Sequence, residues 1–172
     1  MIDHMKSGDL KSFSDELDML VEPDKRNLAE LLYHVIELVK DDFVKNILEN
    51  GADPNLIGKS YQWRPVSLAI EFEQLSILQL LIGAGAAIKT NDSSGLTPLH
   101  LAVDLEADTA HQLHQIPVPT FSRCLLGAGA DPEAKDLQGV SVFELAEQYS
   151  YSSFISLAQA KSEIGSLSTD AI

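Results

Sequence analysis

The stretch Gly95-Leu96-Thr97-Pro98-Leu99-His100-Leu101-Ala102 carries most of the information about the fold of this 172-residue chain. Pro98 suits the first position of a helix, because proline there has no amide hydrogen to lose and its φ is already helical. Thr97, just before it, suits the N-cap, where a side-chain oxygen accepts a hydrogen bond from an amide of the first turn. We therefore predict that helices begin at Pro98 and, by the same argument, at Pro65.

Three related segments recur along the chain, and each follows an apolar run: Gly51-Ala52-Asp53-Pro54-Asn55, Gly85-Ala86-Ala87-Ile88-Lys89 and Gly129-Ala130-Asp131-Pro132-Glu133. A glycine after an apolar run is typical of a helix C-terminus, where the chain needs a positive φ. The first glycines of these segments are separated by 34 and then by 44 residues. Helical units at such spacings indicate a repeat protein, in which stacked neighbours bury a shared core.

The motif at 97–102 and the Gly-Ala-Asp turns resemble the ankyrin repeat, whose units of about 33 residues contain Thr-Pro-Leu-His-x-Ala. The resemblance covers residues 7–161 and implies an all-α fold, an ankyrin-repeat solenoid of stacked helix-turn-helix units joined by hairpin-like loops. We expect a single domain over 1–172. Its expected parts are a degenerate N-cap at 7–22, repeat 1 at 26–58, repeat 2 at 59–91, repeat 3 at 92–135, a C-terminal cap repeat at 136–161 and a flexible tail at 162–172.

Repeat 3 is longer than its neighbours, and the register assigns the surplus to an insertion near 108–119, between its two helices. The residues Ala107–Gln115 are expected to lengthen the first helix. Pro117 and Pro119 then favour an extended connection, because proline cannot continue a helix. A loop at this edge is expected to lie on the surface and to offer a second contact site.

Composition excludes several classes of protein. With 45% hydrophobic and 22% charged residues, the chain matches neither a disordered nor a fibrous protein. It has 26 acidic and 12 basic residues, a net charge of −14, which disfavours nucleic acid and anionic membrane as partners. A single cysteine, Cys124, rules out an internal disulfide, and no apolar run approaches the roughly 20 residues of a membrane span. We expect a cytoplasmic protein.

The histidines and the cysteine do not form a catalytic or metal motif. His111 and His114 share a helix face, but a transition metal needs three or four ligands, and only Asp108 and Cys124 lie near in sequence. The resemblance implies a structural role for His100, bonded to the backbone of a neighbouring loop. Cys124 is expected to be a buried, inert thiol. We therefore expect a protein that is not an enzyme and has no cofactor and no metal.

The resemblance also implies where a partner binds: on the concave face, at the hairpin tips and the exposed ends of the first helices. By register, the candidate partner-binding residues are Tyr61, Trp63, Glu71, Phe72, Leu96, Asp104, Leu105, Leu137 and Tyr149. Tryptophan and tyrosine are enriched in binding hot spots. The alternative for Tyr61 and Trp63 is that they fold over a degenerate hairpin, because Lys59 and Gln62 replace the Asp and Gly of the family.

The main functional hypothesis is a non-catalytic protein–protein interaction module that binds a protein partner. The alternative is a small acidic inhibitor or immunity-type protein that neutralises a basic target, since the negative charge would attract a cationic partner. A regulatory enzyme and a self-associating scaffold are the remaining hypotheses. The sequence leaves the partner, the oligomeric state and the role of the insertion open.

Overall fold

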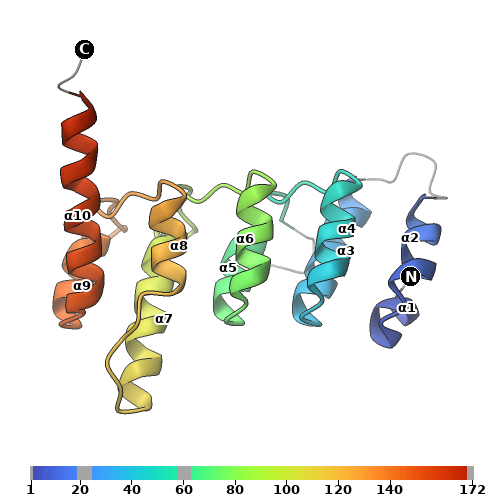
Figure 1. The fold of residues 1–172 in the computed structure, drawn as a ribbon, viewed down its shortest axis with the longest axis horizontal. Coiled ribbons are helices and arrows are strands. Elements are labelled where there is room, and N and C mark those ends of the chain that lie inside the picture. The colour runs from blue at the N-terminus through green and yellow to red at the C-terminus, as the bar shows by residue number, and fades with distance from the viewer. Residues whose placement is uncertain (1, 19–24, 58–62, 170–172) are drawn as a thin grey trace. The chain divides into compact units, whose positions relative to one another are not determined.

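The structure is a computed structural model that describes residues 2–18, 25–57 and 63–169. Over these ranges the regular secondary structure is helical, and one isolated bridge joins Lys135 to Ser141. The helices follow one another in helix-turn-helix pairs, as Figure 1 shows. The expected all-α class is therefore confirmed.

The chain divides into two compact units, which meet in the sequence between Ala87 and Ile88. The expectation of a single domain over 1–172 stays a prediction. Two units are compatible with a repeat protein, because each repeat packs only against its neighbours and the core has no single centre.

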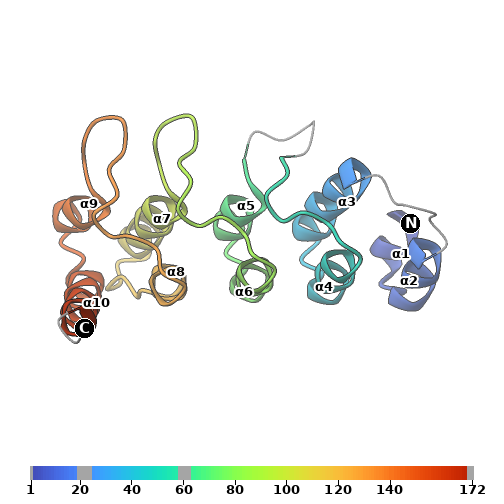
Figure 2. The ribbon, with the colours of Figure 1, turned by 90° about the horizontal axis from the view of Figure 1, so that it is seen from above.

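The N-terminal unit contains six helices in its described residues: α1 (Ile2–Ser7), α2 (Leu10–Asp18), α3 (Lys25–Glu37), α4 (Asp41–Glu49), α5 (Pro65–Glu71) and α6 (Leu75–Gly83). The first helices α3 and α5 pack against each other, and the second helices α2, α4 and α6 pack in order behind them. Figure 2 shows these two layers. Between the layers lie fully buried aliphatic and aromatic side chains, among them Leu32, Tyr33, Ile36, Ile47, Ile70 and Ile77.

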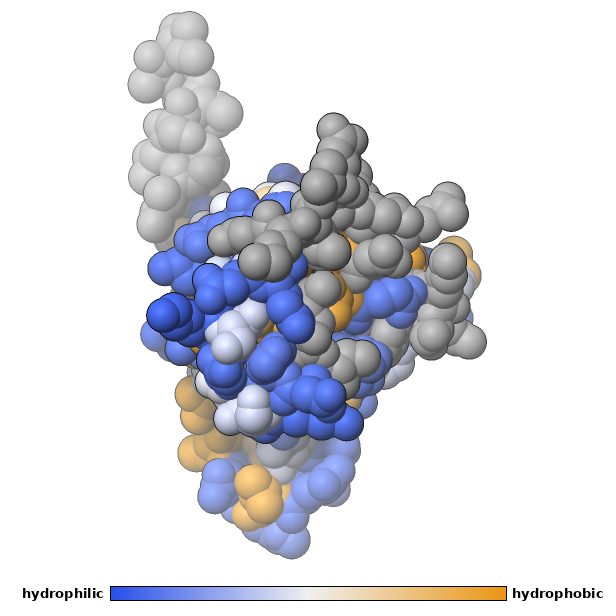
Figure 3. Space-filling model, turned by 90° about the vertical axis from the view of Figure 1, so that its right-hand side faces the viewer, coloured by the Kyte–Doolittle hydropathy of each residue, from blue (hydrophilic) through white to orange (hydrophobic). Residues whose placement is uncertain are grey.

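The N-terminal unit begins with a short helix pair. The sequence predicts a degenerate N-cap at 7–22, and over its described residues the structure has α2, preceded by α1. Met5 of α1 is fully buried. The ring of Phe13 packs on Phe43 of α4, with centroids 4.9 Å apart. The outward side of the pair is mostly polar, with Lys6, Asp15 and other charged residues exposed (Figure 3).

The C-terminal unit contains α7 (Pro98–Gln112), α8 (Phe121–Gly127), α9 (Val142–Gln148) and α10 (Ser152–Thr169). The first helices α7 and α9 pack together, and α8 packs against α10 behind them. Helix α10 continues to Thr169, where the sequence predicts a flexible tail from Ser162. Residues 162–169 contain no proline, and a single glycine, Gly165, is tolerated within a helix.

Capping residues explain where the helices start and stop. Pro65 and Pro98 occupy first helical positions, and Thr97 caps α7 as expected, with a reciprocal bond from its amide to His100 Nδ1. Ser141 and Glu144 form an equivalent capping box on α9. The second helices α4, α6 and α8 are each followed by a glycine with positive φ, at Gly51, Gly85 and Gly129. These termini match the predicted C-caps.

The first helices end in the same left-handed turn without a glycine. The residues with positive φ there are Val39, Glu73, His114 and Ser150. In each turn the next amide donates to a carbonyl five residues earlier, such as Lys40 to Val35 at 3.1 Å and Gln74 to Ala69 at 2.8 Å. The sequence did not indicate these turns, because glycine is their usual marker.

Candidate functional site

The two hairpin tips of the C-terminal unit are built alike. Asp92 Oδ1 accepts hydrogen bonds from the amides of Ser94 and Leu96, at 2.8 and 2.9 Å. Asp136 Oδ1 accepts from Gln138 and Val140, both at 2.9 Å. A carboxylate bonded to the amides two and four residues ahead closes the turn from within. Each tip is therefore fixed by its own backbone, and Figure 2 shows both loops projecting on the side of α7 and α9.

His100 ties the second tip to α7. Its Nδ1 accepts from the Thr97 amide at 3.1 Å, so the ring hydrogen lies on Nε2, which faces the Val140 carbonyl at 3.4 Å. Burial lowers the pKa of His100 below its usual range, although the Val140 contact and the charges of Asp136 and Asp92 raise it. This neutral ring has the structural role that the sequence predicts, bonded to the backbone of a neighbouring hairpin.

Close packing joins the two tips. Gly95 has φ +81°, and a Cβ placed there would lie 2.6 Å from the backbone nitrogen of Leu137. Only a glycine leaves room for this approach. Leu137 itself is 72% exposed at the adjoining tip.

Three of the candidate binding residues of the N-terminal unit are exposed. Trp63 and Phe72, at the two ends of α5, are 42% and 47% exposed, and Glu71 is also exposed. Tyr33, which is buried, donates a hydrogen bond from its hydroxyl to the Trp63 carbonyl, so the backbone before α5 is anchored while the indole stays accessible. Tyr61 lies outside the described residues.

The candidates of the C-terminal unit fall into two groups. Leu137, Tyr149 and Asp104 are exposed, as expected. Leu96 and Leu105 are half-buried, so only part of each side chain is accessible to a partner. Asp104 and Tyr149 hydrogen-bond to each other, and this bond together with burial raises the pKa of Tyr149 to about 12.

The insertion consists of the longer α7 and an irregular loop. Helix α7 has 15 residues, against seven in α9. The loop presents Leu113, Ile116 and Val118 to solvent, with Ile116 81% exposed. Its carbonyl at Pro117 accepts a hydrogen bond from the Ser153 hydroxyl at 2.9 Å, which attaches the loop to α10.

Glu106 is a key residue that the sequence reasoning missed. It lies on the buried face of α7, and its Oε1 accepts from the amides of Thr120, Phe121 and Ser122, at 2.7, 2.6 and 3.2 Å. One carboxylate thus replaces the missing side-chain cap of α8. The sequence carries one signal for it, because Glu106 lies at a position where the helical periodicity expects an apolar residue. An acidic side chain is buried at such a position only when it has hydrogen-bond partners.

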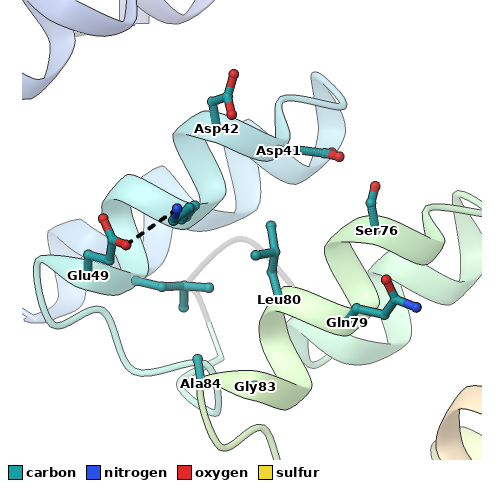
Figure 4. Close-up of a pocket in the computed structure, with 10 residues that line it drawn as sticks. Asp41, Asp42, Glu49, Ser76, Gln79, Leu80, Gly83 and Ala84 are labelled. Carbon is teal, nitrogen blue, oxygen red and sulfur yellow. Dashed lines mark ion pairs between the residues drawn. The ribbon is translucent and has the colours of Figure 1, made fainter.

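A groove of 710 Å³ lies between α4 and α6 in the N-terminal unit (Figure 4). Leu48, Leu80 and Ala84 supply its apolar surface, and Leu80 extends from α6 toward α4. Asp41, Asp42, Lys45 and Glu49 line the α4 side, and Lys45 pairs with Glu49 at 3.9 Å. The remaining lining residues, from α6 and the turn after it, are Ser76, Gln79 and Gly83.

Within the ranges that the structure covers, no three His, Cys, Asp or Glu side chains come together in a way that could hold a metal ion. His111 and His114 are exposed at the end of α7. Cys124 is half-buried rather than fully buried, and burial raises the pKa of its thiol, which makes the reactive thiolate scarcer. Among the helices described, none has the length and apolar character of a membrane span.

Comparison with protein families agrees with this architecture. The family model for ankyrin repeats in three copies matches residues 31–116, which is half of the chain. The match includes the Thr-Pro-Leu-His motif, the helices α4, α5 and α6, and the part of α3 from Leu31 onward. Proteins with these repeats generally mediate protein–protein interaction, and they are typically not catalytic. The chain belongs to the ankyrin-repeat family.

Proposed function

We propose that this protein is a non-catalytic binding module that holds a protein partner on its hairpin tips and on the exposed ends of its first helices. The observation that carries the proposal is the exposure of large apolar side chains at these positions. They are Leu38, Trp63 and Phe72 in the N-terminal unit and Leu137 and Tyr149 in the C-terminal unit.

Exposed apolar groups of this size lower solubility, and grouped ones mark interaction surfaces. Trp63 is the strongest candidate anchor, because tryptophan buries a large area when a partner covers it. Its anchored backbone reduces the ordering cost of binding, since the Tyr33 hydroxyl already fixes the Trp63 carbonyl.

The experiment first captures the partner with the wild-type chain and then measures its affinity in purified form. We expect Trp63→Ala to weaken binding by more than about 2 kcal/mol, as truncation of a hot spot does. The matched control is Ile116→Ala, which also removes an exposed apolar side chain but lies on the inserted loop. If Trp63→Ala keeps wild-type affinity and melting temperature, or if only Ile116→Ala weakens binding, the proposed surface is wrong.

A second candidate is a small acidic protein that neutralises a basic target. The net charge of −14 favours it, because long-range attraction accelerates capture of a cationic partner. Association rates should then fall by about tenfold or more when salt rises from about 50 to about 500 mM. A rate that is independent of salt would exclude electrostatic capture and leave the general binding module.

A further inference from the structure

We propose that the groove between α4 and α6 is a second docking site, and that it accepts an amphipathic, lysine- or arginine-bearing helix of a partner protein. The groove is lined by the second helices of the N-terminal unit, whereas Trp63 and Phe72 flank a first helix, α5. This site is therefore independent of the surface in the proposed function.

The apolar lining of the groove is incompletely covered by the protein itself. Leu48 and Leu80 are only half-buried. Their sequence neighbours Ile47 and Leu81, in contrast, are fully buried in the core. Gly83 and Ala84 at one end have little or no side chain, which keeps that end open. Apolar side chains of a partner would remove the remaining surface from water, which stabilises a complex.

The negative charge along the groove favours a partner segment with positive charge. Three carboxylates, Asp41, Asp42 and Glu49, and one ammonium, Lys45, line the α4 side, which therefore has a net charge of −2. The Lys45–Glu49 pair is exposed on both sides and therefore weak, and it can exchange for a partner cation. A second copy of this chain fits poorly, because it carries the same charge of −14.

The length of the groove sets the size of the segment. The acidic side runs from Asp41 to Glu49, along all nine residues of α4. At a rise of about 1.5 Å per residue this is roughly 13 Å, which matches two to three turns of a bound helix. Apolar residues spaced three and four apart would face Leu48 and Leu80, while flanking basic residues would reach the carboxylates.

The test uses a synthetic helical peptide of about 14 leucine and lysine residues in an amphipathic pattern, and a second peptide with glutamate in place of lysine. Binding to the full chain is followed by backbone amide NMR shifts. We expect the lysine peptide to shift amides of α4 and α6, and the glutamate peptide to bind at least about tenfold more weakly.

Two pairs of variants separate the groove from general charge attraction. Asp41→Asn with Asp42→Asn should weaken binding of the lysine peptide by about fivefold or more, because it removes two of the three carboxylates at the groove. Asp3→Asn with Asp15→Asn makes the same change on exposed positions of α1 and α2 and should leave the affinity unchanged. Thermal melts of both variants verify that they are folded.

Several results would overturn the proposal. These are shifts that avoid α4 and α6, equal losses in the two double variants, equal binding of the glutamate peptide, or no binding at all. Self-association that is abolished by Asp41→Asn with Asp42→Asn would make a second copy the occupant and also contradict it. None of these outcomes bears on Trp63, so the proposed function is tested separately.

Discussion

Tyr151 donates a hydrogen bond from its hydroxyl to Glu106 Oε2 at 3.1 Å, while the other carboxylate oxygen holds three amides at the start of α8. Glu106 therefore connects α7, α8 and the turn before α10. Burial raises the pKa of Glu106, and the hydrogen bonds from Ser122, Phe121 and Tyr151 oppose that rise. Burial and the nearby Glu106 carboxylate also raise the pKa of Tyr151.

We expect Glu106→Ala to destabilise the protein by more than about 3 kcal/mol, because it leaves buried amides without acceptors. Tyr151→Phe removes one hydrogen bond and keeps the ring, so its expected cost is only about 1 kcal/mol. Urea unfolding of both variants measures the difference. Equal stabilities of wild type and Glu106→Ala would mean that water caps α8 equally well.

Stability should decrease at acidic pH because of His100. Its folded pKa lies below its usual value of 6.5, so below that pH the unfolded chain binds a proton that the folded chain does not. The free energy of unfolding therefore falls as pH drops from 6.5 through the folded pKa, by about 1.4 kcal/mol for each pKa unit between the two states.

The check compares the wild type with His100→Gln, by urea unfolding between about pH 7.5 and pH 5. Glutamine does not titrate, so the variant should lose less stability over this range, even though its stability is lower throughout. Parallel pH profiles for the two proteins would show that His100 is not the group responsible.

Val39→Gly should stabilise the protein by about 1 kcal/mol. Val39 has φ 53°, which is costly for a β-branched residue and free of steric cost for glycine. The side chain is 59% exposed, so its loss removes little buried surface. The greater freedom of glycine in the unfolded chain offsets part of the gain. Thermal unfolding measures the change, and a lower melting temperature would contradict the prediction.

Gly95 and Gly139 offer a matched test of the packing between the hairpin tips. Both have positive φ, 81° and 84°, but only Gly95 has a neighbour within reach of an added Cβ. We expect Gly139→Ala to cost about 1 kcal/mol from backbone conformation alone and Gly95→Ala more than about 2 kcal/mol. Equal costs in chemical unfolding would show that Leu137 moves aside without penalty.

The sequence predicts those parts of the fold that depend on neighbouring residues. Thr97 and Pro98 define a helix start through local hydrogen bonding and a fixed φ, and Gly51 marks a helix end for the same local reason. The turn at Val39 was missed because its geometry is imposed by the bonds around it rather than by the residue itself.

Contacts between side chains of different repeats were not predicted, for the same physical reason. Asp104 and Tyr149 were both expected to face a partner and both are exposed, but the sequence did not indicate that they bond to each other across 45 residues. Such a pairing depends on how two repeats stack, and a register argument treats each repeat alone. Exposure of Trp63 and Phe72 was predictable, because the position within the repeat determines it.

The carboxylates of Asp92 and Asp136 allow the sequence of the hairpin tips to vary. Each closes its loop through main-chain amides, so the outward side chains of Ser93, Ser94 and Gln138 take no part in holding the loop together. Substitutions at these three positions, natural or engineered, can therefore give the protein a new binding specificity while the loops and the helices beneath them keep their structure.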